Sequence, residues 1–319
     1  MEEDSLQIRH VKERDPINNS ISNKKSHTDK HANICPDLRI SIIIPAYNEE
    51  KRITKCLTRT LQYCIEQQWD FEILVAVDGS VDNTAKIVDD FHSDDNRIKL
   101  ISLKDRMGKG GALMNATRKA SGSYIAYMDA DLSADPSEIQ RLLEQIDNHD
   151  IVVGSRVLRG NLPPIKRPMT RAIFSHIYSS AFRLLSRLQI YDPQCGLKIL
   201  RRNEVLKILP EIKTTGFAFD SELLVIASMH GLRIKEVPIN WSHDEGSKID
   251  IIKQTTTMGR DLLLIWKKVR SLHNTNKQAI NYRRFKDRKS LMELNYKEVK
   301  ILPKYKHDKD DYGETSVYE

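Results

Sequence analysis

The stretch Tyr124-Ile125-Ala126-Tyr127-Met128-Asp129-Ala130-Asp131 decides the fold, because a short apolar run is followed at once by two carboxylates. In a strand, side chains two positions apart share a face, so Asp129 and Asp131 would lie side by side at the strand's end. Mg²⁺ is usually held by one or two carboxylates together with substrate phosphates. A solvated turn would explain an Asp-x-Asp triplet taken alone. The surrounding sequence instead favours a divalent cation that binds a diphosphate.

Short apolar runs alternate with helix-length segments on both sides of this stretch. The runs cover residues 40–44, 71–77, 98–103, 124–128 and 151–153, and the helix-length segments cover 49–67, 82–91, 111–120 and 136–146. This alternation predicts an α/β fold with a mainly parallel sheet and helices on both faces. Ligands of such sheets bind beyond the carboxyl ends of the strands. The functional residues are therefore expected directly after the apolar runs.

Composition predicts one catalytic domain with polar ends. Residues 1–37 lack apolar periodicity and are expected to be a disordered tail, and residues 38–240 carry the alternating pattern of the catalytic domain. Residues 241–272 combine a Gly-Ser-Lys loop with an amphipathic helix, and residues 273–319 form a charged C-terminal tail. We find no internal repeat.

Several classes of protein are disfavoured by composition. The four cysteines form no Cys-x-x-Cys pair and no Cys/His cluster, which argues against a zinc site or a disulfide framework and favours a reducing compartment. The chain contains no apolar run of about 18 residues and no secretory leader, so we expect neither secretion nor a membrane span. A net charge of +7 among 30% charged residues is modest, and we expect no nucleic-acid partner.

Informative residues follow the first three apolar runs. Asn48, in Pro45-Ala46-Tyr47-Asn48-Glu49-Glu50, can cap a helix. Asp78 could accept a hydrogen bond from a ribose hydroxyl or a base N–H, although an Asx turn would also explain it. The segment Gly108-Lys109-Gly110-Gly111 lets the backbone approach phosphates while Lys109 adds charge, but its spacing is not that of a P-loop.

Seven motifs, in order, resemble those of family-2 inverting glycosyltransferases, and most closely those of the dolichyl-phosphate glucosyltransferases and their mannosyltransferase relatives. The resemblance covers about residues 39–270 and rests on Pro45-Ala46-Tyr47-Asn48-Glu49-Glu50, Val77-Asp78-Gly79-Ser80, Gly108-Lys109-Gly110-Gly111-Ala112, Asp129-Ala130-Asp131, Gly154-Ser155-Arg156, Asp192-Pro193-Gln194-Cys195-Gly196-Leu197-Lys198 and Phe219-Asp220-Ser221-Glu222-Leu223. It implies a Rossmann-like GT-A fold, a nucleotide-sugar donor, a divalent metal (Mg²⁺ or Mn²⁺) and a polyprenyl phosphate acceptor.

The same resemblance implies roles for particular residues. Asp129 and Asp131 would hold the metal and the diphosphate, and Asp220 would lie near the sugar. Residues of the nucleotide-sugar site would be Pro45, Ala46, Tyr47, Glu49, Asp78, Lys109, Ala130, Ser247 and Lys248, the last two closing over the diphosphate.

Asp220 has two interpretations. A hydroxyl acceptor needs a general base, for which Asp220 is the candidate, whereas a phosphomonoester is already largely dianionic at neutral pH and needs none. Asp220 would then only position other groups. The neighbouring Glu222 is interpreted as mostly structural.

A basic segment points to an anionic lipid. Residues 154–191 contain no acidic residue, and basic residues alternate with apolar ones at helical spacing. This pattern predicts an interfacial amphipathic helix, although a core helix with a solvated basic face would also fit. Arg156 is our first candidate for the acceptor phosphate and Arg171 the second. A further amphipathic helix is expected within 249–270, too short and polar to span a bilayer.

The sequence therefore predicts transfer of a hexose, with UDP-glucose favoured, to a polyprenyl (dolichyl) phosphate with inversion. GDP-mannose as donor, a hydroxyl acceptor, and a noncatalytic sugar-nucleotide-binding module recruited to membranes remain alternatives. A sugar nucleotidyltransferase is disfavoured because the loop after the first run lacks glycine. We expect a cytoplasmic protein that binds peripherally to the cytoplasmic face of a membrane. The sequence indicates no oligomeric state.

Overall fold

The computed structural model describes residues 39–158, 169–242, 257, 259–268 and 270, with the backbone alone for 169–172. The predicted tails over 1–37 and 273–319 lie outside these residues. So do Ser247 and Lys248, and the side chain of Arg171 is not described.

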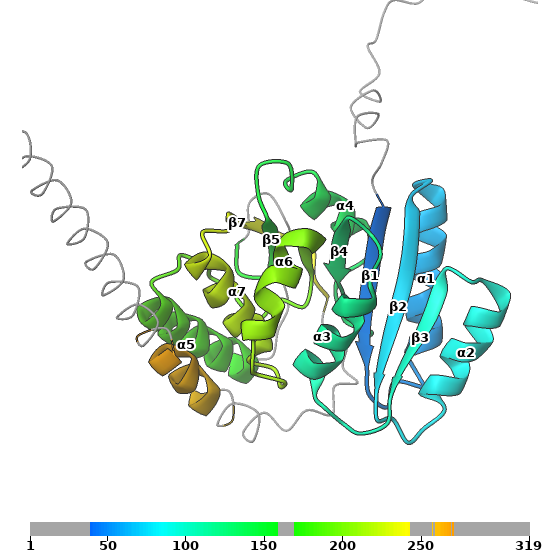
Figure 1. Ribbon diagram of the computed structural model, residues 1–319, viewed down its shortest axis with the longest axis horizontal. Coiled ribbons are helices and arrows are strands. Elements are labelled where there is room, and N and C mark those ends of the chain that lie inside the picture. The colour runs from blue at the N-terminus through cyan, green and yellow to red at the C-terminus, as the bar shows by residue number, and fades with distance from the viewer. Residues whose placement is uncertain (1–38, 159–168, 243–256, 258, 269, 271–319) are drawn as a thin grey trace, which may run out of the picture. The chain divides into compact units, whose positions relative to one another are not determined.

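Seven strands form one sheet in the order β3-β2-β1-β4-β6-β5-β7 (Figure 1). Their bounds are β1 Arg39–Ala46, β2 Asp70–Asp78, β3 Ile98–Leu103, β4 Tyr124–Tyr127, β5 Ile151–Ser155, β6 Lys198–Arg201 and β7 Ile234–Pro238. All pairings are parallel except those of β6, which runs antiparallel to both β4 and β5. The predicted mainly parallel α/β sheet is confirmed, and the five apolar runs of the sequence are β1 to β5.

Helices connect the strands. Their bounds are α1 Ile53–Glu66, α2 Thr84–Asp94, α3 Lys109–Lys119, α4 Ser137–Leu143, α5 Met169–Ser186, α6 Arg202–Ile208 and α7 Phe219–Met229, with a 3₁₀ turn η1 over Leu209–Glu211. A further helical segment covers residues 259–268. α1 packs against α2, whereas α3 packs against α6 and α7. Among the described helices, none combines the length and the apolar content that crossing a membrane would require.

The strand register brings the functional motifs to one edge of the sheet. Ile43 of β1 pairs with Tyr127 of β4, and Ala46 of β1 pairs with Val77 of β2. Since these strands are parallel, the residues that follow each of them leave the sheet at the same side. The chain after β1 therefore lies between the chain after β2 and the chain after β4, where a ligand of an open α/β sheet binds.

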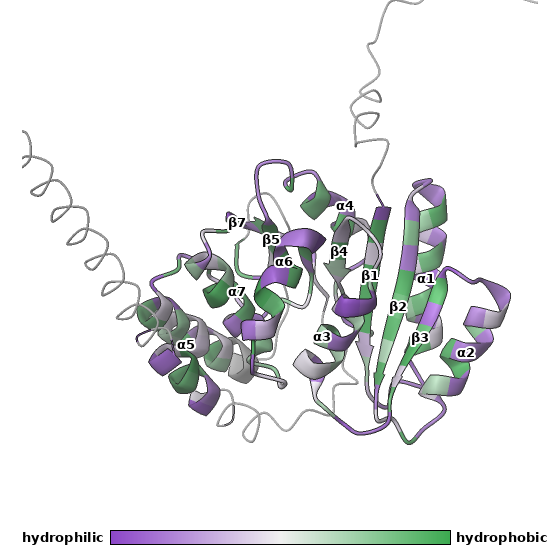
Figure 2. Ribbon diagram, viewed as in Figure 1, coloured by the Kyte–Doolittle hydropathy of each residue, from purple (hydrophilic) through white to green (hydrophobic). Residues whose placement is uncertain are grey.

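The core consists of apolar strands covered by the inner faces of the helices (Figure 2). Ile42, Ile44, Ile73 and Val75 are fully buried. β2 is buried from Phe71 to Asp78 without interruption, as expected for a strand covered on both faces. This continuous core holds the strand ends in fixed positions.

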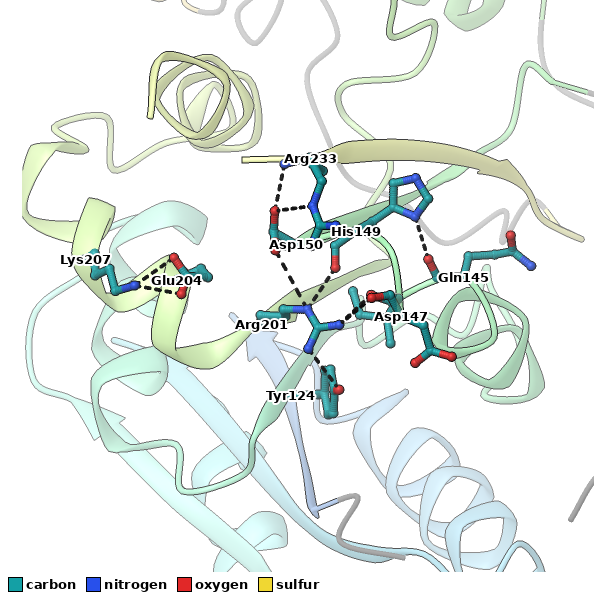
Figure 3. A network of polar contacts seen from close by, with 10 residues as sticks. Tyr124, Gln145, Asp147, His149, Asp150, Arg201, Glu204, Lys207 and Arg233 are labelled. Carbon is teal, nitrogen blue, oxygen red and sulfur yellow. Dashed lines mark hydrogen bonds and ion pairs between the residues drawn. The ribbon is translucent and has the colours of Figure 1, made fainter. Parts of the chain in front are cut away.

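A polar network surrounds Arg201, the last residue of β6, at the amino ends of the parallel strands, opposite the functional motifs (Figure 3). The Arg201 guanidinium donates to the backbone carbonyls of His149, Ile146 and Asp147 at 2.9, 2.9 and 3.0 Å and to the Tyr124 hydroxyl at 3.2 Å. Nearby, Asp150 accepts from the backbone N–H of Arg233 at 2.9 Å. The network joins the loop before β5 to β4, β6 and β7.

Candidate active site

Asp129 and Asp131, which we call the acidic pair, leave the sheet directly after β4. Met128 continues the strand's ladder by donating its N–H to the Ile43 carbonyl at 3.1 Å. Asp131 accepts from the backbone N–H of Ser133 at 2.9 Å. Leu132 has a φ of 54°, a left-handed conformation that is uncommon for a bulky residue and that turns the chain sharply after the pair. The loop is thus folded to keep both carboxylates at the sheet edge.

A chain of alternating charges extends from the half-buried acidic pair into the buried interior of the protein. Lys109, the first residue of α3, places its Nζ 2.7 Å from Oδ1 of Asp129 and 3.9 Å from Oδ2 of Asp220. Asp220 is buried at the start of α7 and also accepts from Nζ of the fully buried Lys198 at 2.6 Å. Lys198 further donates to the Cys195 carbonyl. Both candidate carboxylates, Asp129 and Asp220, are therefore paired with lysines.

The charges of this chain affect one another's titration. Burial alone would raise the pKa of Asp129, but the positive charge of Lys109, its hydrogen bond and the charges of Arg156 and Lys198 lower it. The pKa of Asp131 is raised, mainly by burial and then by the negative charge of Asp129. Burial and the charges of the acidic pair also raise the pKa of Glu49. The Asp131 side of the pair therefore carries unbalanced negative charge, which a cation would relieve.

Gly196 forms the wall against which Asp129 lies. A Cβ placed on Gly196 would overlap the Asp129 carboxylate, with Oδ2 as the nearest atom. This glycine precedes β6, and because β6 is antiparallel its amino end lies at the same edge as the carboxyl end of β4. A side chain at this position would displace the carboxylate.

These residues fit a divalent cation. Two carboxylates at one edge offer the oxygen donors that Mg²⁺ and Mn²⁺ prefer. Within the described part of the chain, no group of three or more histidine, cysteine, aspartate or glutamate side chains could hold a metal ion. A pair of carboxylates at a sheet edge would hold such a cation together with substrate phosphates.

Arg156, predicted to bind the acceptor phosphate, lies after β5 and is already paired. Its Nε and Nη2 each donate to the Asp192 carboxylate at 2.7 Å, and its backbone N–H donates to the same group at 2.9 Å. Asp192 is buried, and its own N–H and that of Tyr191 donate to Glu236 of β7. Arg156 also lies 5.7 Å from the centroid of the Trp241 ring. The guanidinium is therefore held in one orientation beside the acidic pair.

The residues predicted to hold the nucleotide gather after β1 and β2. The guanidinium of Arg106 stacks 3.7 Å from the centroid of the Tyr47 ring. Asp78 is buried and accepts from the backbone N–H groups of Met107 and Gly108 at 2.6 and 2.8 Å. It thereby fixes the loop that begins α3, where Gly108 has a φ of 87° and a Cβ would lie 2.7 Å from the Thr215 carbonyl. Asp78 thus holds the glycine-rich loop and Lys109 in place.

A pocket opens on the Asp131 side of the acidic pair. Its volume is about 330 Å³, and it is lined by Lys51, Arg52, Lys55, Ala130, Asp131, Leu132 and Ser242. Ser242 joins this wall because its N–H donates to the Ser133 carbonyl at 2.7 Å. Ligand pockets commonly measure about 300–1,000 Å³. The pocket is large enough for a phosphate-containing group.

The structure brings together most of the residues chosen from the sequence. Asp129, Asp131, Lys109, Asp220 and Arg156 are linked by contacts or by charge effects at one edge. Pro45, Ala46, Tyr47, Glu49, Asp78 and Ala130 lie at the ends of β1, β2 and β4. Glu222 accepts from the backbone N–H groups of Lys213 and Thr214, which agrees with its structural interpretation.

The sequence analysis assigned no site role to Lys51 or Lys55. It assigned none to Asp192, Gly196 or Lys198 either, although these three lie in one of the motifs on which the resemblance rests. Lys198 carried a usable signal, because it interrupts the apolar run Leu197-Lys198-Ile199-Leu200, and a lysine there needs a buried partner. Lys51 and Lys55 carried no comparable signal, since exposed lysines at helical spacing are common.

Known proteins resemble this chain in sequence. A profile of the family described as "Glycosyl transferase family 2" matches residues 41–208. The glycosyltransferase AglD of Haloferax volcanii is 31% identical over 72% of this chain, which spans 37% of the length of AglD. The dolichyl-phosphate beta-glucosyltransferase of Saccharomyces cerevisiae is 28% identical over 78% of this chain and 79% of its own length. The enzyme of that name from Dictyostelium discoideum is 30% identical over 74% of this chain and 76% of its own length.

Solved structures share the fold. Glucosyl-3-phosphoglycerate synthase from Mycobacterium tuberculosis in complex with UDP superimposes with a TM-score of 0.55 at 18% identity, over 72% of this chain and 80% of the synthase. The same synthase with Mn²⁺, UDP-glucose and glycerol 3-phosphate gives the same TM-score, identity and coverage. These neighbours confirm the predicted GT-A architecture.

Proposed function

This chain belongs to glycosyl transferase family 2, and we propose that it transfers glucose from UDP-glucose to a polyprenyl (dolichyl) phosphate with inversion at the sugar. That it is a glycosyltransferase follows from its family. The acceptor is suggested by relatives named dolichyl-phosphate beta-glucosyltransferase in yeast, Dictyostelium and other eukaryotes, at 28–32% identity. The donor is suggested by the same relatives.

The observation that carries the proposal is the acidic pair at the sheet edge, with Lys109 bonded to Asp129 and a pocket beside Asp131. Asp129 and Asp131 would hold Mg²⁺ or Mn²⁺, whose charge stabilises a departing diphosphate when it is bound. Lys109 adds a positive charge directly beside the pair. Structural neighbours crystallised with Mn²⁺ and UDP-glucose support this reading of the site.

Asp220 favours an acceptor that needs no general base. Its carboxylate is buried and bonded to Lys198 at 2.6 Å, with Lys109 at 3.9 Å from its other oxygen. Each carboxylate oxygen thus faces a lysine ammonium group, which makes Asp220 a partner of Lys198 and Lys109 rather than of an acceptor hydroxyl. A phosphomonoester, with a second pKa of about 6, is mostly dianionic at neutral pH and attacks without losing a proton. Asp220 then positions Lys109 instead of accepting a proton.

A direct assay tests the proposal. Purified full-length protein is incubated with polyprenyl phosphate, Mn²⁺ or Mg²⁺, and either labelled UDP-glucose or labelled GDP-mannose, and label is followed into organic-extractable lipid. We expect transfer from UDP-glucose, and loss of transfer in Asp131→Asn with an unchanged circular dichroism spectrum.

Other outcomes contradict parts of the proposal. Transfer from GDP-mannose alone would replace the donor. Label that appears only as free sugar or on a hydroxyl acceptor would exclude the lipid phosphate. Normal transfer by Asp131→Asn would remove the metal from the mechanism.

We also propose that the enzyme binds a membrane surface through α5 and the helical segment 259–268. Exposed apolar side chains on them are Ile173, Phe174, Ile177, Leu184, Leu263 and Leu264. Arg183 of α5 and Lys267 of the segment 259–268 lie among these positions, and Arg187 and Arg270 follow just after the two helices. Each basic residue near an anionic surface contributes about 1 kcal/mol. A polyprenyl phosphate resides in such a surface, so this face would bring the enzyme to its acceptor.

The two helices are attached to the same part of the protein. Lys268 donates to Glu222 of α7 at 2.7 Å. The segment 259–268 also lies close to α5, because the negative charge of its Asp261 acts on Tyr178 of α5. This charge adds to the effect of burial, which raises the pKa of Tyr178 to about 12. Binding of the purified protein to lipid vesicles measures this surface directly.

A further inference from the structure

We propose that the pocket beside Asp131 is an anion site in which Lys51 and Lys55 bind a phosphoryl group of a substrate. The proposal deepens the proposed function, on which it rests for the identity of the substrate. The pocket is lined by Lys51, Arg52 and Lys55 together with Ala130, Asp131, Leu132 and Ser242. Three cations in one pocket with a single carboxylate give it a positive balance.

The cations around the acidic pair differ in whether a carboxylate already binds them. Lys109 is bonded to Asp129, and Arg156 is bonded twice to Asp192. Arg52 donates to both carboxylate oxygens of Glu49, at 2.6 and 2.9 Å. Lys51 and Lys55 are exposed, and within the described part of the chain their ammonium groups form no ion pair or hydrogen bond. These two charges are available to neutralise a ligand.

Helix stability does not account for this placement. The three cations lie just before and within the first turn of α1, and that turn contains no acidic residue. Cations near a helix N-terminus oppose the helix dipole, each at a cost of a few tenths to about 1 kcal/mol. Lys51 and Lys55 are four positions apart and therefore lie on one side of the chain as it enters the helix. Their common direction is toward the pocket that Asp131 lines.

The geometry also predicts how anion binding depends on metal. Asp131 lies in the pocket wall, two positions from Asp129, so the wall carries a carboxylate group. Without a divalent cation, this carboxylate repels a phosphoryl group and offsets part of the attraction of the lysines. With the cation on the acidic pair, the same wall becomes attractive. Anion affinity in this pocket should therefore rise when Mn²⁺ is added.

The first test measures binding without catalysis. The full-length protein is titrated calorimetrically with pyrophosphate and, separately, inorganic phosphate, each with and without Mn²⁺. The variant is Lys51→Ala/Lys55→Ala, and the control is Lys86→Ala/Lys119→Ala, which removes two exposed lysines from α2 and α3. In the presence of Mn²⁺ we expect pyrophosphate to bind about tenfold or more weakly to the pocket variant than to the wild type and the control, a typical effect of losing charge-assisted hydrogen bonds.

The second test identifies the source of the phosphoryl group. A raised Kd for UDP with an unchanged KM for polyprenyl phosphate assigns the pocket to the donor diphosphate. A raised KM for polyprenyl phosphate with an unchanged Kd for UDP assigns it to the acceptor. A change for inorganic phosphate alone, with both substrates unaffected, overturns the substrate role.

The outcomes separate this inference from the proposed function. If no lipid is glucosylated but pyrophosphate affinity still falls in the pocket variant, the anion site stands and the acceptor assignment fails. Wild-type affinity of the pocket variant for pyrophosphate and UDP, together with an unchanged KM for the lipid, overturns the site. So does a failure of the wild type to bind pyrophosphate at millimolar concentration with Mn²⁺. Equal thermal unfolding of the two double variants excludes a folding defect as the cause.

Discussion

At the scale of single residues, the position of Asp129 is set by what surrounds it. Lys109 bonds one of its oxygens at 2.7 Å, and the backbone of Gly196 leaves no room for a side chain beside the other. Ionic attraction and steric exclusion thus act on one carboxylate from different elements. Catalysis depends on such positioning, because small displacements of a reacting or binding group lower the rate steeply.

Gly196→Ala is expected to impair transfer much more than folding. The added methyl group would overlap the Asp129 carboxylate, which must rotate away from Lys109 and from the proposed position of the metal. We predict a loss of transfer of about 100-fold, the size expected when a catalytic group is displaced by about 1 Å. Steady-state kinetics with thermal unfolding in parallel measures both effects.

Gly216→Ala is the matched control for this prediction. A Cβ at Gly216 meets no atom within 4 Å, so the same chemical change should leave transfer nearly unaltered. Equal activity of the two alanine variants would show that Asp129 does not need its present position.

At the scale of elements, the sequence predicted the parallel part of the fold and missed its reversed part. β1 to β5 were readable because each is a mainly apolar run before a turn. β6 is only four residues long and includes Lys198, and β7 reads Ile234-Lys235-Glu236-Val237-Pro238, with charges at its centre. Neither pattern predicts a buried strand. Their role comes from long-range pairing, which local sequence does not encode.

The same distinction applies to the site. Asp129, Asp131, Lys109 and Asp78 were identified because each follows or precedes an element in a motif of recognisable chemistry. The pairing of Arg156 with Asp192, 36 positions away, depends on the approach of two loops. The pairing of Lys198 with Asp220 likewise depends on β6 lying next to α7. Partners of this kind become apparent only once the sheet order is known.

The stability contributed by β2 is predicted to depend on pH through Glu72. Glu72 is buried and accepts from Ser41, Ser121 and Lys99, thereby joining β2 to β1, β3 and the loop before β4. Burial alone would raise the pKa of Glu72, but these hydrogen bonds outweigh burial and lower it to about 2. Because the folded-state pKa lies below the ordinary value of 4.5, the stabilisation is complete above about pH 4.5 and is lost as pH falls toward 2.

Glu72→Gln should therefore lower the free energy of unfolding by about 3 kcal/mol at neutral pH, and by progressively less as pH falls below about 4.5. Urea unfolding at a series of pH values measures this difference. The exposed Glu66→Gln, in α1, serves as control and should remain close to the wild type throughout. A penalty for Glu72→Gln that is independent of pH would contradict the assigned role of the carboxylate.

Arg201→Met is predicted to destabilise the edge opposite the site without changing the chemistry. The guanidinium donates to three backbone carbonyls and to the Tyr124 hydroxyl, and its removal leaves these acceptors without their partner. We expect the free energy of unfolding to fall by about 2–4 kcal/mol.

Urea unfolding measures the loss, and Arg118→Met, an exposed position of α3, is the control. The kcat of the folded Arg201→Met fraction should equal that of the wild type. A similar stability of both variants would mean that water replaces the Arg201 network at no cost.

At the scale of the whole molecule, the proposed membrane face should be separable from catalysis. Leu184 is 80% exposed and Ile177 is 58% exposed on α5, far in sequence from the acidic pair. Ile177→Glu or Leu184→Glu should weaken binding to vesicles that contain anionic lipid by about tenfold each, because insertion of one large apolar side chain contributes about 1.5–3 kcal/mol.

Vesicle cosedimentation measures this effect, and Ile65→Glu, on α1, is the control with a partly exposed isoleucine. The affinity for UDP in solution should be unchanged in all three variants. Vesicle binding that is equally strong in Leu184→Glu and Ile65→Glu would place the membrane contact elsewhere.

The reversed direction of β6 has a consequence for how this enzyme tolerates change. The parallel strands β1, β2, β4 and β5 carry their functional residues at or after their carboxyl ends, but β6 carries Gly196 just before its amino end, and Lys198 is its first residue. Sliding β6 by two residues against β4 would preserve its inward and outward faces, yet it would carry both residues about 7 Å along the sheet. An insertion or deletion between Asp192 and Lys198 that moved β6 in this way would therefore displace the wall beside Asp129 and also separate the buried Lys198 from Asp220, so activity and stability would fall together.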